Sequence, residues 1–198
     1  MENKNIGFAV TGSFCTLNKV LPYIEMLVKS GNNVFPIISY AAASYDTRFT
    51  KAEKVKEDLK RLTNNKLITT IVEAEPIGPK SYLDILIIAP CTGNTLAKLN
   101  SSIIDTPVLM AAKAHLRNGK PLVIAMASND GLAGNAKNIG ELLNKKNIYF
   151  VPFTQDDSVK KCFSLVADFN LIIPTLELAL DGKQLQPVLI SSYTKNNN

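Results

Sequence analysis

The sequence predicts one α/β domain in which a parallel sheet is covered by helices on both faces. Short apolar runs without alternation recur along the chain, as expected for strands that are buried on both faces. Segments with apolar residues at helical spacing separate these runs, which is the pattern of parallel strands joined by crossover helices. The length of 198 residues suits a single core. We expect residues 1–182 to form this domain and residues 183–198 to be a C-terminal tail, frayed over its last five residues.

The first half of the chain is expected to supply two strands and two long helices. The strands are the apolar runs 5–10 and 33–39, and Pro36 in the second run favours a place at a sheet edge or a bulge. Apolar residues at helical spacing predict helices over 17–28 and 50–62. These elements give the start of a βαβ pattern.

Two connections follow the second strand and carry less regular patterns. Residues 40–49 are polar and aromatic and predict a loop. Residues 66–83 contain two prolines and a glycine, which predict a long connection with one short strand.

The second half of the chain continues the alternation. Its most apolar run, 82–89, predicts a central strand that Pro90 ends. The remaining expected elements are helices over 93–99 and 106–119, a strand over 120–127, a helix after the polar loop that begins at 127, a strand over 148–153, and helices over 158–168 and 173–181.

Composition and charge narrow the class of protein. Hydrophobic residues make up 46% of the chain, but no apolar run approaches the ~20 residues of a membrane helix, and the start has no room for a signal peptide. We therefore expect a cytoplasmic protein without a membrane partner. The net charge of +5 is spread along the chain, which favours an anionic small molecule over nucleic acid. Three distant cysteines and a single histidine predict reduced thiols and no metal site.

Small polar residues follow four of the predicted strands. They are Thr11, Gly12 and Ser13 after the first strand, Ser39 after the second, Thr92, Gly93, Asn94 and Thr95 after the central strand, and Asn129 and Asp130 after the next. Each loop alone is explained as a tight turn or a helix cap. Together they lie at one edge of a parallel sheet, where ligands bind, and their hydroxyls, amides and helix N-termini suit a phosphate-bearing cofactor without a metal. Neither a GxGxxG fingerprint nor a P-loop is present.

Two single residues have both a functional and a structural interpretation. His115 could belong to a cationic group with Lys113, Arg117 and Lys120, but helical spacing spreads these side chains, and a structural histidine is the simpler interpretation. Cys91 has no base near it in the sequence, so a buried filler is favoured over a nucleophile.

Several motifs together resemble the homo-oligomeric flavin-containing cysteine decarboxylase superfamily. They are "TGSFC" after the first strand, Ser39, "PCTGNT" after the central strand, and "DTPVLMAAKAHLRNGKPLVIA". The resemblance implies a three-layer αβα, Rossmann-like (flavodoxin-like) domain that binds FMN and assembles as trimers or dodecamers. It also implies flavin contacts from Gly12, Ser13, Ser39, Thr92, Gly93, Asn94 and Thr95.

Within this superfamily, "EAEPIGPK" and "MAAKAHLRN" resemble the B subunits of dipicolinate synthases, flavoproteins of spore-forming bacteria. This resemblance implies a dehydrogenase-like partner, the A subunit of dipicolinate synthase, and a small dicarboxylate substrate that is oxidised to dipicolinate. Lys113, His115, Arg117 and Asn129 are candidate donors to the two substrate carboxylates.

The chain also departs from the superfamily pattern. The decarboxylases have a histidine about fourteen residues before the proline of the central loop, where this chain has "AEPIG", and a PxMNxxMW-like segment, where it has "MASNDGLAGN". The prenyltransferases have an arginine near the end of the strand "LVIAMA", where this chain has alanine or serine. The alternatives are therefore an FMN-dependent decarboxylase or flavin prenyltransferase, which these departures disfavour, and a non-catalytic subunit that binds flavin and stabilises a partner.

Overall fold

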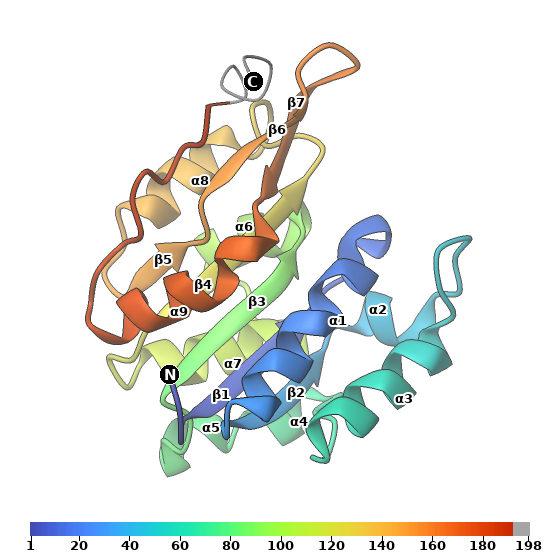
Figure 1. Cartoon of the computed structure of the whole chain (residues 1–198), viewed down its shortest axis with the longest axis vertical. Coiled ribbons are helices and arrows are strands. Elements are labelled where there is room, and N and C mark those ends of the chain that lie inside the picture. The colour runs from blue at the N-terminus through green and yellow to red at the C-terminus, as the bar shows by residue number, and fades with distance from the viewer. Residues whose placement is uncertain (192–198) are drawn as a thin grey trace.

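The computed structural model describes residues 1–191 and has one seven-stranded sheet (Figure 1). The strands are β1 (Asn5–Val10), β2 (Asn33–Ile38), β3 (Ile85–Cys91), β4 (Leu122–Ser128), β5 (Ile148–Phe150), β6 (Phe153–Asp157) and β7 (Lys161–Ala167). The strand order is β2-β1-β3-β4-β7-β6, and β5 also pairs with β4. The strands β1 to β5 pair in parallel, whereas β7 pairs antiparallel with both β4 and β6.

Helices cover both faces of this sheet. One face carries α1 (Phe14–Lys29), α3 (Ala52–Thr63) and α9 (Ile172–Leu180). The other carries α4 (Ile71–Ala74), α5 (Ile77–Lys80), α6 (Gly93–Asn100), α7 (Pro107–Leu116) and α8 (Ala136–Leu143). Two short elements complete the fold: α2 (Tyr40–Ser44) after β2 and the 3₁₀ turn η1 (Phe169–Leu171) before α9. The predicted three-layer α/β architecture is confirmed, with a sheet that is mainly parallel.

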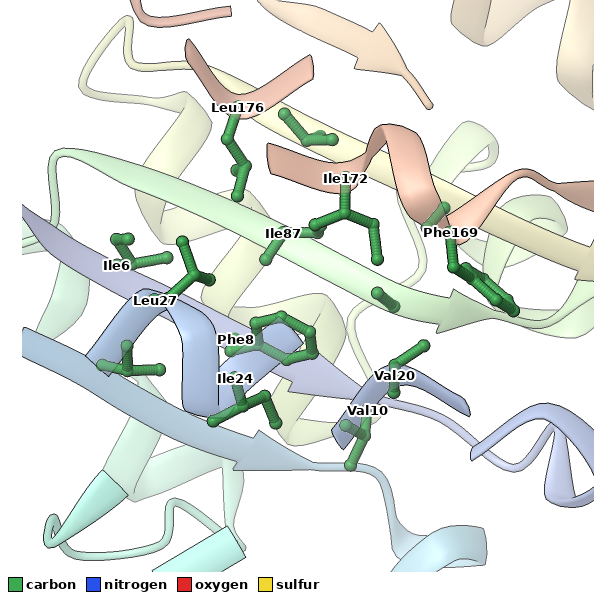
Figure 2. Packing of buried hydrophobic residues seen from close by; sticks show 14 of the residues in the cluster. Ile6, Phe8, Val10, Val20, Ile24, Leu27, Ile87, Phe169, Ile172 and Leu176 are labelled. Atoms are coloured by element: carbon green, nitrogen blue, oxygen red, sulfur yellow. The ribbon is translucent and has the colours of Figure 1, made fainter. Parts of the chain in front are cut away.

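The core consists of two apolar layers, one on each side of the sheet. Phe8 of β1 and Ile87 of β3 are fully buried beneath α1 and α9. Figure 2 shows Ile24 and Leu27 of α1 and Ile172 of α9 in the apolar cluster that covers these strands. The central strands are buried on both faces, which is why their sequences read as continuous apolar runs.

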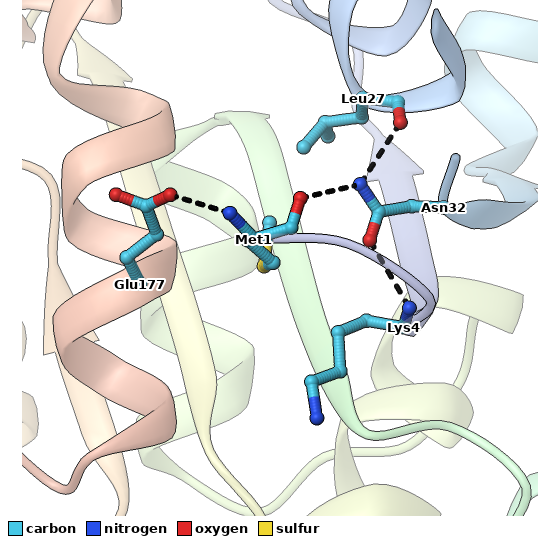
Figure 3. A network of polar contacts seen from close by, with 5 residues as sticks. All are labelled: Met1, Lys4, Leu27, Asn32 and Glu177. Atoms are coloured by element: carbon cyan, nitrogen blue, oxygen red, sulfur yellow. Dashed lines mark hydrogen bonds and ion pairs between the residues drawn. The ribbon is translucent and has the colours of Figure 1, made fainter. Parts of the chain in front are cut away.

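A polar network joins the start of the chain to helices at the amino edge of the sheet (Figure 3). The Met1 amino group donates to Glu177 Oε1 of α9 at 2.8 Å. The Asn32 side-chain amide donates to the carbonyl oxygens of Met1 and Leu27, and its Oδ1 accepts from the Lys4 amide at 3.1 Å. Asn32 is 6% exposed, and these bonds satisfy its polar atoms beside the core.

The predicted helix over 158–168 is wrong, because these residues form a turn and the strand β7. The Asp157 carboxylate accepts hydrogen bonds from the Val159 and Lys160 amides, which closes a tight turn between β6 and β7. The apolar run after this turn is short, and its pattern fits a helix or a strand. It forms a strand because it pairs with β4 and β6.

Smaller differences occur at connections and strand ends. Strand β3 continues through Pro90 to Cys91, with a shift in its register against β4, although Pro90 was expected to end the strand. The expected loop after β2 contains the short helix α2, and the connection before β3 contains α4 and α5 with one isolated bridge, between Ile37 and Ile68. The edge position predicted from Pro36 is confirmed, since β2 ends the strand order.

The fraying expected for residues 194–198 lies outside the described residues. Part of the predicted tail is in contact with the sheet, because Gln184 exchanges hydrogen bonds with the backbone of Phe150 and the Ile190 amide donates to Phe153 O. None of the helices in the described part of the chain has both the length and the apolar character needed to span a bilayer.

Candidate functional site

A cleft of about 1030 Å³ lies at the carboxyl edge of the sheet. Its walls come from the first turns of α1 and α6, the loop after β4, the hairpin β6–β7 and the segment around η1. In an open parallel sheet this edge is where helix N-termini converge, so the fold places backbone donors around the cleft.

Thr11 joins two of the strand ends that form the floor of this region. Its hydroxyl donates to Pro90 O at 2.6 Å and accepts from the Thr92 amide at 3.1 Å. Thr11 is 1% exposed, so these bonds are made away from water and fix the loop after β3 against the loop after β1.

Most of the predicted site residues lie on the cleft wall. The lining includes Gly12, Ser13, Thr92, Gly93, Asn94, Asn129 and Asp130. The structure gives Ser39 and Thr95 different positions, since both are buried at helix N-termini and neither is among the lining residues. The Ser39 hydroxyl accepts from the Ala42 amide and so caps α2, and Thr95 Oγ1 lies 3.0 Å from Thr92 Oγ1.

The N-terminus of α1 is suited to an anion. Ser13 occupies the N-cap position, yet within the described chain its side chain accepts no hydrogen bond from the backbone of α1. The first turn of α1 has no acidic residue. Gly12 allows the loop after β1 to pack closely against α2, because a Cβ atom at position 12 would lie 3.2 Å from Ala41 Cβ. These features leave the positive end of the helix available to a ligand in the cleft.

The second helix N-terminus, that of α6, is held by Thr92, whose hydroxyl accepts from the Thr95 amide at 3.3 Å. Behind it, Asp130 accepts hydrogen bonds from the Ser128 hydroxyl and, through both carboxylate oxygens, from the Asn135 side-chain amide. These bonds, with that from Ser128 foremost, lower the pKa of Asp130. Gly93 packs against this cluster, because a Cβ atom there would lie 2.5 Å from both Ser128 Oγ and Asn135 Nδ2.

Sequence reasoning missed the wall formed by the hairpin. Thr154, Asp156, Lys161 and Ser164 all line the cleft from β6 and β7. Lys161 Nζ lies 2.5 Å from Asp156 Oδ2, and this hydrogen bond raises the pKa of Lys161. Cys15 of α1 lines the same cleft, so the hairpin and the first turn of α1 form two of its walls. The available signal was the cluster of turn-forming residues "DDS" between two short runs that contain aromatic and β-branched residues.

The substrate donors expected on α7 lie away from this cleft. His115 is 1% exposed, and its Nε2–H donates to Pro121 O at 3.0 Å. Burial lowers the pKa of His115 to about 4, so the ring is neutral near pH 7 and the cationic interpretation is wrong. Lys113 and Arg117 lie on the same helix and at its end, and neither is among the residues that line the cleft.

Cys91 is fully buried, as the filler interpretation expects. Burial raises the pKa of its thiol, which keeps the sulfur protonated and unreactive near neutral pH. The described lining of the cleft supplies hydroxyls, amides, backbone N–H groups and the exposed thiol of Cys15, with Asp130, Asp156 and Asp168 as carboxylates and Lys19 and Lys161 as cations.

Comparison with known proteins decides the family. The sequence pattern of the Flavoprotein family matches residues 1–167. The chain belongs to the Flavoprotein family. Across 197 residues, this flavoprotein is 45% identical to the B subunit of dipicolinate synthase from Bacillus subtilis (strain 168), covering 100% of the chain and 98% of that relative.

Two further similarities place this flavoprotein among its relatives. The crystal structure of the B subunit of dipicolinate synthase from Bacillus halodurans superposes with a TM-score of 0.88 at 45% identity, covering 96% of this chain and 97% of that one. The coenzyme A biosynthesis bifunctional protein CoaBC of Methanocaldococcus jannaschii is 31% identical over 153 residues, which are 76% of this chain and 36% of that protein. The chain thus spans about a third of that longer relative.

Proposed function

We propose that this flavoprotein binds FMN in the cleft and acts as the B subunit of a dipicolinate synthase. The observation that carries the proposal is the 45% identity to such a protein over the full length of both chains. The close agreement with a second protein of this kind, at a TM-score of 0.88, supports it. We infer a cytoplasmic role in a spore-forming bacterium, with the chain assembled as a homo-oligomer.

The donor set of the cleft fits a flavin mononucleotide. A phosphate monoester needs several N–H and O–H donors, and the uncapped start of α1 with Ser13 offers them. A ribityl chain carries hydroxyls that can pair with Thr92 and Asn94 on the neighbouring loop. Ser39 and Thr95 support these loops from behind by holding α2 and α6. When bound, FMN supplies a two-electron acceptor, and this chemistry belongs to the cofactor.

The reaction is the oxidation of dihydrodipicolinate, or of its hydroxylated tetrahydro precursor, to the aromatic dicarboxylate. Oxidation of the dihydro compound removes one hydride and one proton from the ring. The protein's part is to orient the ring, exclude water and accept the proton, and the cleft offers three aspartates for the last task. The partner in this proposal, the A subunit of the synthase, resembles a pyridine-nucleotide dehydrogenase, so its nicotinamide is a second acceptor for the hydride.

The proposal is tested with purified protein and the dehydrogenase-like partner. The protein should carry, or take up, one FMN per chain, and dipicolinate should form with both proteins present and not with the partner alone. A protein that binds no FMN would contradict the cofactor assignment. Equal synthesis by the partner alone would contradict a catalytic role for this chain. Anaerobic mixing with substrate, with and without NAD(P)⁺, would identify the acceptor by bleaching of the flavin band.

The motif resemblance to the flavin-containing cysteine decarboxylases makes an FMN-dependent decarboxylase the second candidate. The structure supplies an observation against it, because the single histidine of the chain is buried in the α7 layer and not in the cleft. Release of CO₂ from a substrate ending in cysteine would favour this candidate. A stabilising subunit without catalysis would instead keep full synthesis after loss of its flavin.

A further inference from the structure

The charges on the cleft wall are few, and most of them are negative. The described lining residues include two lysines, Lys19 and Lys161, and three aspartates, Asp130, Asp156 and Asp168. The substrate of the proposed function carries two carboxylates, and a carboxylate that leaves water needs a cation or several N–H donors. A cation that accepts a carboxylate in this cleft must therefore be one of the two lysines, or lie outside the lining.

Two of the three aspartates are held by fixed neutral donors. Asp130 accepts from Ser128 and Asn135, and Asp168 accepts from the Asn170 amide and side chain, where it caps η1. Asp156 differs, because its carboxylate is paired with the ammonium group of Lys161. The cleft thus already contains one ion pair between a carboxylate and a lysine.

This ion pair is built so that it can be exchanged. The Lys161 side chain is 59% exposed and that of Asp156 is 39% exposed, so the pair is worth little and can open toward the cleft. Both residues lie near the tip of the hairpin, on either side of the turn at Asp157. Lys161 lines the cleft together with Cys15 in the first turn of α1, so its ammonium group borders the space that a ligand would occupy.

We propose that Lys161 binds one carboxylate of the dicarboxylate substrate and that Asp156 occupies this lysine when substrate is absent. The Asp156 carboxylate stands in for the carboxylate of the ligand. Binding then exchanges one ion pair for another, with no net loss of pairing for the lysine. The inference rests on the proposed function, and it adds a substrate-binding residue and a competing internal ligand.

The test measures binding of dipicolinate to the FMN-loaded protein by titration calorimetry or by the change in flavin fluorescence. Lys161→Gln should raise the Kd about tenfold, because a charge-assisted hydrogen bond is lost. Asp156→Asn should lower the Kd about threefold, because it removes the competing carboxylate. The double variant should have the same Kd as Lys161→Gln alone, because the Asp156 carboxylate competes with the ligand only when Lys161 is present.

Lys160→Gln is the matched control, because Lys160 is a neighbouring exposed lysine that does not line the cleft. It should leave the Kd unchanged, and all variants should keep their FMN and their unfolding midpoint. An unchanged Kd in Lys161→Gln, or a weaker complex in Asp156→Asn, would overturn the inference while leaving the proposed function intact. Wild-type protein that binds FMN but neither dipicolinate nor its dihydro precursor, and makes no dipicolinate with the dehydrogenase-like partner, would overturn both.

Discussion

The Thr11 hydroxyl donates to Pro90 O at 2.6 Å and thereby joins the carboxyl ends of β1 and β3 beneath the cleft. Thr11→Val removes this bond and the one from the Thr92 amide, and it leaves the buried Pro90 O and the part-buried Thr92 N–H without this partner. We expect a loss of about 2 kcal/mol in the free energy of unfolding, measured with urea, and weaker retention of flavin. Thr11→Ser keeps the hydroxyl and should lose less than half as much. Equal losses in the two variants would show that the methyl group, not the hydroxyl, matters.

Gly93 lies where no side chain fits. Gly93→Ala should cost about 1–3 kcal/mol, because its Cβ would meet Ser128 Oγ and Asn135 Nδ2 at 2.5 Å. Gly140→Ala is the control, since within residues 1–191 no atom outside the local helix lies within 4 Å of a Cβ atom built at that exposed position in α8. It should stabilise the protein by about 0.5–1 kcal/mol. Thermal unfolding of the flavin-free proteins separates the two, and similar midpoints for both variants would contradict the close packing at Gly93.

Ser13→Asp tests the assignment of the α1 N-terminus to a phosphate. An aspartate can cap α1, which has no acidic residue in its first turn, so the flavin-free protein should be at least as stable as wild type. The same negative charge repels a phosphate, so FMN affinity should fall by more than about tenfold. Flavin titration followed by fluorescence measures this. Normal FMN binding by the variant would show that the phosphate does not bind at the N-terminus of α1.

His115 makes stability depend on pH in a defined window. Burial lowers its folded pKa from 6.5 to about 4, so a proton binds the unfolded chain more tightly than the folded one. The contribution of neutral His115 to the free energy of unfolding is about 3 kcal/mol. It is complete above about pH 6.5 and is lost as the pH falls toward 4. Unfolding free energies at a series of pH values should show this slope, and His115→Gln should flatten it.

Carboxylates change the stability of the protein in a separate, lower pH range. The pKa of Glu73 is lowered to about 2, mainly by its hydrogen bond with Lys66, so its contribution is lost only as the pH falls below about 4.5. A wild-type slope confined to that lower range would contradict the role given to His115.

The sequence predicts best those elements whose hydrophobic pattern fits only one type of secondary structure. The apolar runs of β1, β3 and β4 are too continuous for a half-exposed strand, and the apolar residues of α1 and α7 recur at helical spacing. The strand-end loops follow from this order, which is why Gly12, Ser13 and Thr92 could be placed at one edge from the sequence.

What escaped prediction depends on contacts between segments distant in the sequence. The run after Lys160 could be a helix or a strand until its pairing with β4 is known, so the hairpin and its Lys161–Asp156 pair were missed. His115 could be exposed or buried, since its helix is apolar on several sides. Ser39 and Thr95 were grouped with the cleft residues because sequence shows the residue type at a strand end but not the direction of its side chain.

The hairpin β6–β7 is paired with the rest of the sheet over a short length. β7 pairs with β4 through Ala127 and Ser128 alone among the described residues, so the tip can change in length and charge without disturbing the buried strands. The loops after β1 and β3 are in contrast tied to each other through Thr11. If the proposed function holds, exchanging this hairpin between relatives should change substrate binding and leave the loops after β1 and β3, and with them FMN binding, unaltered.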